Sequence, residues 1–341
     1  MNKHILDFFK ESLEVFFIEK QQAPTQEQEI SQDDFISWVA RKGDRFLTAG
    51  YDCTIQLWPV PSPTDHPLCK IVCHDRVKCL DWINEHSFAS AGFDQTAKLW
   101  KLNLSKKSVD NWCSLRGHKG PIMSIKCHDS KLATGSQDCA VKIWSSDETA
   151  PNEEEHKKQS SEDTIPTRLP LMTFVGHRQM VCSVDWVDEN NVLSASWDHS
   201  MRMWDLVQQK ETKTIMTGIA VHAMKVSPVS GYVLTGGASH GTRVYDLRAT
   251  DSVLYALPTS QHDSSISALA WAPHKSDQFV TSTVHGSVLL WDLRNSKTCL
   301  YQLKAHKQMV TCVDWAPAHN KEHFILTSSA DSTVKIFNCP Q

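Results

Sequence analysis

The chain carries residue types that perform acid–base and nucleophilic chemistry, in an order that repeats: a histidine, then a serine or threonine, then an aspartate. His177, Ser194 and Asp198 are one such set, and these three residue types form the catalytic triad of many hydrolases. The set recurs in other stretches, each time with a tryptophan as a fourth member and without a nucleophile elbow. Recurrence in several copies indicates a structural network, so we predict that the chain is not an enzyme.

Two other groups could bind a metal or a phosphate. Cys69, Cys73 and His74 include two thiols four residues apart, but no second pair lies at the spacing of zinc ligands. The glycine-rich segment 235–241 lacks the Gly-Lys-Ser/Thr sequence of a phosphate-binding loop. We therefore expect no metal and no cofactor.

The composition of the 341 residues describes a globular chain, with 40% hydrophobic and 22% charged residues. A net charge of −4 argues against a generic duplex-DNA binder. No run approaches 18 apolar residues, and Asp7 falls too early for a signal peptide, so a membrane partner is not expected. The 11 cysteines without a secretory signal indicate reduced thiols in the cytosol or nucleus.

Tryptophan is unusually frequent, with 12 copies, and the positions of these residues reveal a repeat. Seven short apolar runs end in an aromatic residue, at intervals of 41 to 60 residues: Trp58, Trp100, Trp144, Trp204, Tyr245, Trp291 and Phe337. Six residues before each stands an aspartate or a substitute: Asp52, Asp94, Asp138, Asp198, Ser239, His285 and Asp331. Four residues earlier again stands a hydroxyl residue: Thr48, Ser90, Thr134, Ser194, Thr235, Thr281 and Thr327.

A histidine precedes these positions in five copies: His74, His118, His177, His262 and His306. Gln32 takes its place in copy one and Ile219 in copy five. Each copy holds three or four short segments rich in β-forming residues, separated by turn residues. Seven such copies predict an all-β propeller.

From about residue 24 to the C-terminus the sequence resembles the WD-repeat family. The hallmark dipeptides are Gly117-His118, Gly176-His177, Trp204-Asp205 and Trp291-Asp292. The resemblance implies a seven-bladed WD-repeat β-propeller over residues 24–341, with one buried hydrogen-bond network per blade. Three blades have the full set: His74, Ser90, Asp94 and Trp100; His118, Thr134, Asp138 and Trp144; His177, Ser194, Asp198 and Trp204. We expect these blades to be the stiffest and blade five, which lacks both His and Asp, to be the softest.

The ends of the repeat indicate how the ring closes. The sequence stops four residues after Phe337, which leaves no fourth strand for the last blade. Residues 24–30 are placed to supply that strand and to remove an open sheet edge. Residues 13–19, within the extension 1–23, also have high β propensity and are a second candidate.

One segment interrupts the repeat. Residues 145–168 are charged and free of aromatic residues, so we predict a disordered surface insertion. Residues 156–159 offer a weak nuclear-localisation motif, for which a solvated loop is the alternative.

The remaining candidates for function lie on the surface. In the family, the residue just before each aspartate position points to the narrow top face: here Tyr51, Phe93, Gln137, Trp197, Ala238, Val284 and Ala330. Aromatic residues, Met and Arg are enriched at interface hot spots. The predicted partner-binding residues are therefore Tyr51, Phe93, Trp197, Arg178, Met180 and Met309. Packing of each ring on its neighbouring blade is the alternative.

Direct RNA binding would be auxiliary, because the basic residues of this rim are spread over four blades: Arg76, Lys119, Arg178 and Lys307.

Some stretches resemble one subfamily more closely. They are LSASWDH (193–199), the charged insertion before Gly176-His177, LWDLR (290–294) followed by Leu300-Tyr301, and Glu19-Lys20 followed by Ala23-Pro24. These are similar to the WD-repeat subunits of the complex with Pescadillo and the Block-of-proliferation protein. The resemblance implies a nucleolar and nucleoplasmic scaffold that binds Block-of-proliferation and Pescadillo homologues and large-subunit pre-ribosomal particles during ribosomal RNA processing.

Members of that subfamily also carry an N-terminal ubiquitin-like domain that engages the ATPase midasin. Residues 1–23 match only the end of such a domain and are too short to bury its core, so the midasin contact is not carried over. The competing function is a peptide-binding adaptor, such as a ubiquitin-ligase substrate receptor or a signalling scaffold. A ring of charge around the channel would favour the adaptor, whereas aromatic residues on one side of the top face favour a broad, flat partner.

Overall fold

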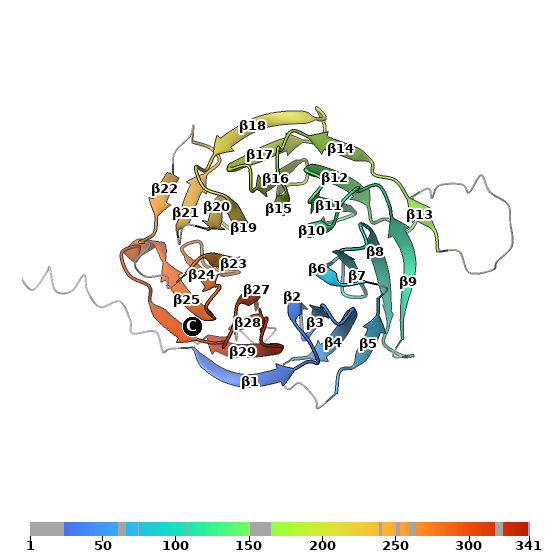
Figure 1. Ribbon diagram of the computed structural model, residues 1–341, viewed down its shortest axis with the longest axis horizontal. Coiled ribbons are helices and arrows are strands. Elements are labelled where there is room, and N and C mark those ends of the chain that lie inside the picture. Colours follow the sequence, from blue (N-terminus) through green and yellow to red (C-terminus); the bar gives the residue numbers. More distant parts are fainter. Residues whose placement is uncertain are drawn as a thin grey trace, which may run out of the picture.

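A computed structural model describes residues 24–60, 66–73, 75–106, 108–150, 165–238, 241–249, 253–258, 264–317 and 323–339. These residues form seven sheets arranged in a ring about a central axis (Figure 1). The prediction of an all-β, seven-bladed propeller is confirmed. In the part of the chain just delimited, no helix is long and apolar enough to cross a membrane.

The blades follow one another along the chain. Blade one contains β2 (Ile36–Lys42), β3 (Arg45–Gly50), β4 (Thr54–Pro59) and β5 (Cys69–Val72). Blade two contains β6 (Val77–Trp82), β7 (Ser87–Gly92), β8 (Ala97–Asn103), β9 (Ser108–Leu115) and β13 (Thr167–Arg168). Blade three contains β10 (Ile122–His128), β11 (Lys131–Ser136), β12 (Ala140–Ser145) and β14 (Met172–Val175). Blade four contains β15 (Val181–Asp188), β16 (Asn191–Ser196), β17 (Ser200–Asp205) and β18 (Lys210–Met216).

The other three blades have the same order. Blade five contains β19 (Val221–Val226), β20 (Tyr232–Gly237), β21 (Thr242–Asp246) and β22 (Val253–Ala256). Blade six contains β23 (Ile266–Trp271), β24 (Gln278–Thr283), β25 (Ser287–Asp292), the 3-10 helix η2 (Leu293–Asn295) and β26 (Tyr301–Lys304). Blade seven contains β27 (Val310–Pro317), β28 (His323–Ser329), β29 (Thr333–Cys339) and β1 (Thr25–Ser31).

The ring is closed by its first strand, as predicted for residues 24–30. β1 pairs antiparallel with β29, with Ile30 opposite Val334 (Figure 1). Ile30 is buried in a cluster that contains Ile36 and Ile336, so the first strand joins the core between blades one and seven. Residues 13–19, the second candidate for this role, lie outside the described residues.

An Asp-Trp pair on the innermost strand ties a blade to both of its neighbours. In blade four, the Trp186 indole N–H donates to the carbonyl of Lys126 in blade three, at 3.0 Å. The Asp185 carboxylate accepts the backbone N–H of Val226 in blade five, at 2.9 Å. Asp81 and Trp82 make the equivalent bonds from blade two to blades three and one. These bonds supplement the apolar contacts between blades and fix the orientation of blades two and four relative to their neighbours.

The charged insertion differs from the prediction at its two ends. Residues 145–150 and 165–168 have defined positions, and β13 adds a short parallel strand to the outer edge of blade two. Arg168 is buried and donates to the carbonyls of Asp147 and Ala150, at 2.6 and 2.9 Å. Its guanidinium also lies over the Trp112 ring, 5.1 Å from the ring centre. One arginine therefore joins the two ends of the insertion to the propeller. Residues 151–164, which include the motif at 156–159, lie outside the described residues.

Candidate partner-binding face

The top face carries the turns between the second and third strands of the blades. In six blades, a backbone hydrogen bond holds the residue that precedes the aspartate position. The N–H of Trp197 donates to the Met180 carbonyl at 3.1 Å, and the N–H of Tyr51 donates to the Phe35 carbonyl at 2.9 Å. The turn is thereby tied to the loop that leads into the innermost strand, and its side chain is presented on this face.

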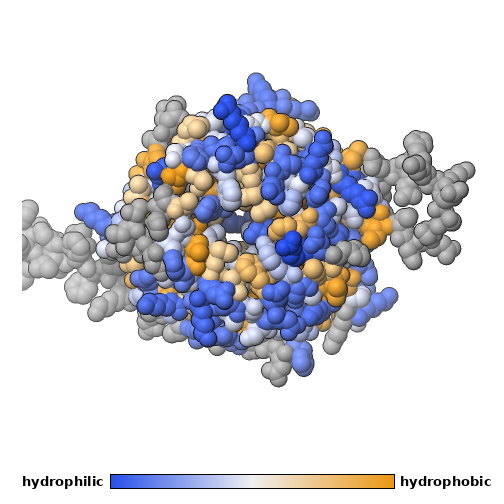
Figure 2. All heavy atoms as spheres, in the orientation of Figure 1, coloured by the Kyte–Doolittle hydropathy of each residue, from blue (hydrophilic) through white to orange (hydrophobic). Residues whose placement is uncertain are grey.

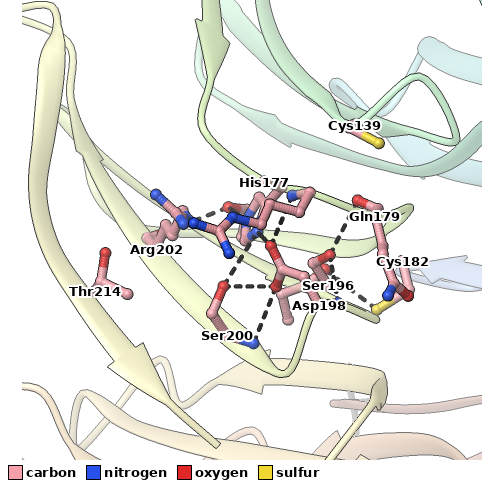
Figure 3. Close-up of polar contacts among 12 residues, drawn as sticks. Cys139, His177, Gln179, Cys182, Ser196, Asp198, Ser200, Arg202 and Thr214 are labelled. Carbon is pink, nitrogen blue, oxygen red and sulfur yellow. Dashed lines mark hydrogen bonds and ion pairs between the residues drawn. The ribbon is translucent and has the colours of Figure 1, made fainter.

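Below the top face, blades three and four each contain a complete hydrogen-bond network. In blade four, His177 contacts Asp198 through Nδ1 at 2.9 Å (Figure 3). Its Nε2 contacts the Ser194 hydroxyl at 2.8 Å. The Trp204 indole N–H donates to the Ser194 hydroxyl at 2.8 Å. The Asp198 carboxylate also accepts the backbone N–H of Arg178, which fixes the start of the top-face loop.

The network of blade three has the same geometry. His118 lies 2.8 Å from Asp138 and 2.7 Å from Thr134. The Trp144 indole donates to the Thr134 hydroxyl at 2.9 Å. The carboxylate of Asp138 accepts the N–H of Lys119 at 2.8 Å, so this blade also links its core to its top-face loop.

The other blades described contain partial or substituted versions of this hydrogen-bond network. In blade two Trp100 donates to Ser90 at 2.8 Å, while Asp94 pairs with Lys98 at 2.6 Å. Its predicted histidine, His74, lies outside the described residues, as does His262. In blade one the Gln32 amide donates to the Thr48 hydroxyl, in the role that histidine has elsewhere. Blade seven keeps the polar set without tryptophan: His306 contacts Asp331 at 3.2 Å and Thr327 at 2.8 Å.

Electrostatics and burial support a structural role for these sets. Burial disfavours the imidazolium and lowers the pKa of His177. Burial alone would raise the pKa of Asp198, but hydrogen bonds from Ser200, the Arg178 backbone and His177 outweigh it and lower the value to about 2. The Ser194 hydroxyl is fully buried, so a substrate has no access to it. Over the described ranges, no group of three His, Cys, Asp or Glu residues is arranged to hold a metal ion.

Two of the predicted binding residues, Tyr51 and Phe93, meet at the boundary between blades one and two. Their rings are 5.6 Å apart with an edge-to-face geometry. Phe35 stacks on Tyr51 at 4.5 Å, and the Arg76 guanidinium lies over Phe93, 4.3 Å from the ring centre. We call Phe35, Tyr51, Arg76 and Phe93 the aromatic–arginine cluster. Both predicted rings are half-buried, so packing on the neighbouring blade accounts for much of their contact area.

The other apolar feature is a funnel at the mouth of the central channel, with a cavity volume of about 300 Å³. An opening at the centre of the disc, with apolar residues beside it, is visible in the space-filling view (Figure 2). All seven blades contribute to its lining. We call this cavity the central funnel, and its lining includes Trp38, Lys78, Met123, Met180, Cys182, Trp197, His222, Met224, Lys225, Ser267, Val284, Met309, Thr311, Cys312 and Val313.

Three of the six predicted binding residues therefore line one cavity: Met180, Trp197 and Met309. Trp197 is 42% exposed, and its ring lies 5.9 Å from the His222 ring. Arg178 is exposed on the loop beside Asp198 but does not line the funnel.

The funnel residues that come from the innermost strands were not among those predicted from the sequence. Six of them occupy the position after the first apolar residue of such a strand: Lys78, Met123, Cys182, His222, Ser267 and Thr311. That repeat position was the available signal, since the innermost strands of a propeller line its channel.

Fold and site together define a WD-repeat propeller with an apolar top-face funnel. The sequence profile of the family described as WD domain, G-beta repeat matches residues 65–101, 111–145, 168–205 and 297–338.

Curated relatives match over nearly the whole chain. The ribosome biogenesis protein WDR12 homolog of Culex quinquefasciatus is 30% identical over 338 residues, covering 96% of this chain and 78% of that protein. The homolog of Drosophila mojavensis is 30% identical over 335 residues and that of Aedes aegypti 28% over 337, with the same coverage. The chain belongs to the family of WD-repeat proteins formed by these WDR12 homologs.

Proposed function

We propose that this protein is a non-enzymatic scaffold in large ribosomal subunit biogenesis and ribosomal RNA processing. It binds a partner propeller within a Pescadillo-type complex. Similarity to proteins named for ribosome biogenesis, over 96% of the chain, supports the process. Under this proposal its partners are Block-of-proliferation and Pescadillo homologues and pre-ribosomal particles, and it is found in the nucleolus and nucleoplasm.

The observation that carries the binding role is Trp197 on the top face. Its indole is 42% exposed beside Met180 and Met309, in a network-supported turn. A rigid, exposed aromatic beside flexible methionines is typical of an interface hot spot. Lys119, Arg178 and Lys307 are exposed on the loops that precede the innermost strands of blades three, four and seven, and they are proposed to make auxiliary RNA contacts. Arg76 instead belongs to the aromatic–arginine cluster.

The test is affinity purification of the tagged chain from nuclear extract, with partners identified by mass spectrometry. We expect the wild type to recover Pescadillo and Block-of-proliferation homologues. Trp197→Ala should weaken this binding by about 2 kcal/mol, roughly thirtyfold, because a hot-spot ring is lost. The matched control is Tyr255→Ala, which removes a 39% exposed ring from β22 on the outer edge of blade five. Recovery of ubiquitin-ligase subunits without ribosome factors would instead favour the peptide-binding adaptor.

A further inference from the structure

The walls of the central funnel are apolar and adaptable. Met123, Met180 and Met309 line it together with Trp197 and Val284. Methionine side chains are flexible and polarisable, so they adjust to apolar groups of different shape. A second cavity of about 230 Å³ shares Trp38, Lys225, Cys312 and Val313 with the funnel, so these residues form the floor between the two.

The charge in the funnel has one sign. Among the described residues that line it, Lys78 and Lys225 are cationic and no carboxylate is present. The Lys225 ammonium lies over the Trp38 ring, 5.9 Å from its centre. Burial lowers the pKa of His222, which favours the neutral imidazole. The lining of the funnel therefore presents positive charge, and the carboxylate that acts on Lys225, that of Asp314, lies in the second cavity.

Lys78 is the unsatisfied member of this pair. Its ammonium makes no hydrogen bond or ion pair with any described residue, and burial lowers its pKa. Lys126, which lines the second cavity, differs from Lys78 because its ammonium has a carboxylate partner, Asp81, at 3.0 Å. Burial would lower the pKa of Lys126, but the Asp81 carboxylate raises it above the ordinary value. The Lys78 side chain is only partly exposed, so an anion that reaches its ammonium is screened less by water than at the open surface and gains a charge-assisted hydrogen bond.

We propose that the central funnel binds a protein segment in which a carboxylate side chain neighbours an apolar side chain, with the carboxylate on Lys78 and the apolar group against Met180, Met309 and Trp197. This proposal rests on the proposed function that the top face binds a protein, and it names the chemistry of the segment that enters the channel. Met and Trp walls match an apolar side chain better than a hydrated nucleic-acid backbone, which is why the anion is assigned to a peptide.

The test is selection from a phage-displayed library of random 12-residue peptides against the purified full chain, with RNA absent. The wild type should enrich peptides with Asp or Glu beside a large apolar residue. A selected peptide should bind Lys78→Met about tenfold to a hundredfold more weakly, since one charge-assisted hydrogen bond is lost. Lys78→Arg should restore binding because it keeps the charge. Lys304→Met, on the exposed outer strand β26, is the matched control and should bind as the wild type does.

Three results would overturn the proposal: no enrichment, enriched peptides without an acidic residue, or equal binding by Lys78→Met. Displacement of the peptide by a short poly-U RNA at equimolar concentration would assign the site to nucleic acid and would also contradict it. Thermal melting of Lys78→Met provides the folding control, and removal of a partly buried, unpaired charge should leave the melting temperature unchanged or higher. If Lys78→Met still binds Pescadillo homologues and Trp197→Ala does not, this inference is contradicted while the proposed function is supported.

Discussion

At the scale of single residues, the buried histidines couple folding to pH. Burial lowers the pKa of His306 below the ordinary histidine value of about 6.5, so the folded state holds this imidazole neutral. The unfolded chain takes up a proton as the pH falls through that value, whereas the folded chain resists it. The stabilising contribution of His306 is therefore present above about pH 6.5 and is lost as the pH falls. Each tenfold difference in proton affinity between the unfolded and folded states corresponds to about 1.4 kcal/mol.

A glutamine at this position should flatten the pH response. Blade one already uses Gln32 to reach its hydroxyl residue, Thr48, so His306→Gln has a precedent within the chain. We expect the free energy of unfolding to fall between pH 7 and pH 5 in both proteins, but less steeply in the variant. Urea titrations at several pH values measure this, and equal slopes would contradict the role given to His306. His177 remains titratable in both proteins, so a residual slope is expected.

Single residues also show which contacts could be predicted from the sequence and which could not. The repeat phase grouped His118, Thr134 and Asp138 because their spacing is fixed by the blade, and hydrogen bonds join them. The residues that line the funnel from the innermost strands were not identified in this way. Each innermost strand has a register irregularity near its start, as between Ile122 and Ser124, which breaks the simple alternation of faces. Which side chain enters the channel there depends on this local geometry.

At the scale of elements, β13 and Arg168 form a clamp on blade two. The N–H groups of Ser114 and Arg116 donate to the carbonyls of Pro166 and Arg168 at 2.8 and 3.0 Å. Arg168→Met keeps the length of the stem but removes its donors to the carbonyls of residues 145–150.

We expect Arg168→Met to release β13. Peptides covering β9 should then exchange their amide hydrogens at least about tenfold faster, because the free energy of local opening falls by about 1.4 kcal/mol. Hydrogen exchange with mass spectrometry measures this, and peptides from β16 in blade four serve as the internal control. Unchanged protection of β9 would show that the clamp does not depend on the arginine.

The clamp could not have been predicted from the sequence. Thr167 and Arg168 form a two-residue strand with no periodicity, within a segment whose composition is that of a solvated loop. Its position is decided by one buried guanidinium and its carbonyl acceptors, which is a tertiary effect. The closing strand β1 was predictable because the repeat count left one blade a strand short.

At the scale of the whole molecule, the blades share one architecture but differ in how well their polar atoms are satisfied. Three buried hydroxyl groups of blade five have no hydrogen-bond partner among the described residues: Thr235, Thr242 and Tyr245. In blade three the hydroxyl equivalent to Thr235 is Thr134, which is bonded to both His118 and Trp144. Buried polar atoms without partners lower local stability.

Blade five should therefore open more readily than blade three. We expect peptides from β20 and β21 to exchange amide hydrogens faster than those from β11 and β12, by a factor of about ten for each 1.4 kcal/mol of local stability lost. Exchange in the wild type, followed over hours, is the measurement. Blade five protected as well as blade three would contradict the link between the networks and stiffness.

The pairing of β1 with β29 also has a consequence for synthesis on the ribosome. Among the strands of the propeller, β1 is synthesised first and its partner at residues 333–339 is synthesised last. β1 therefore has no partner at first, and the nascent propeller presents two unsatisfied sheet edges until residues 333–339 have left the ribosome. A truncated product never closes the ring and keeps those edges open to chaperones and proteases, so closure distinguishes finished molecules from unfinished ones.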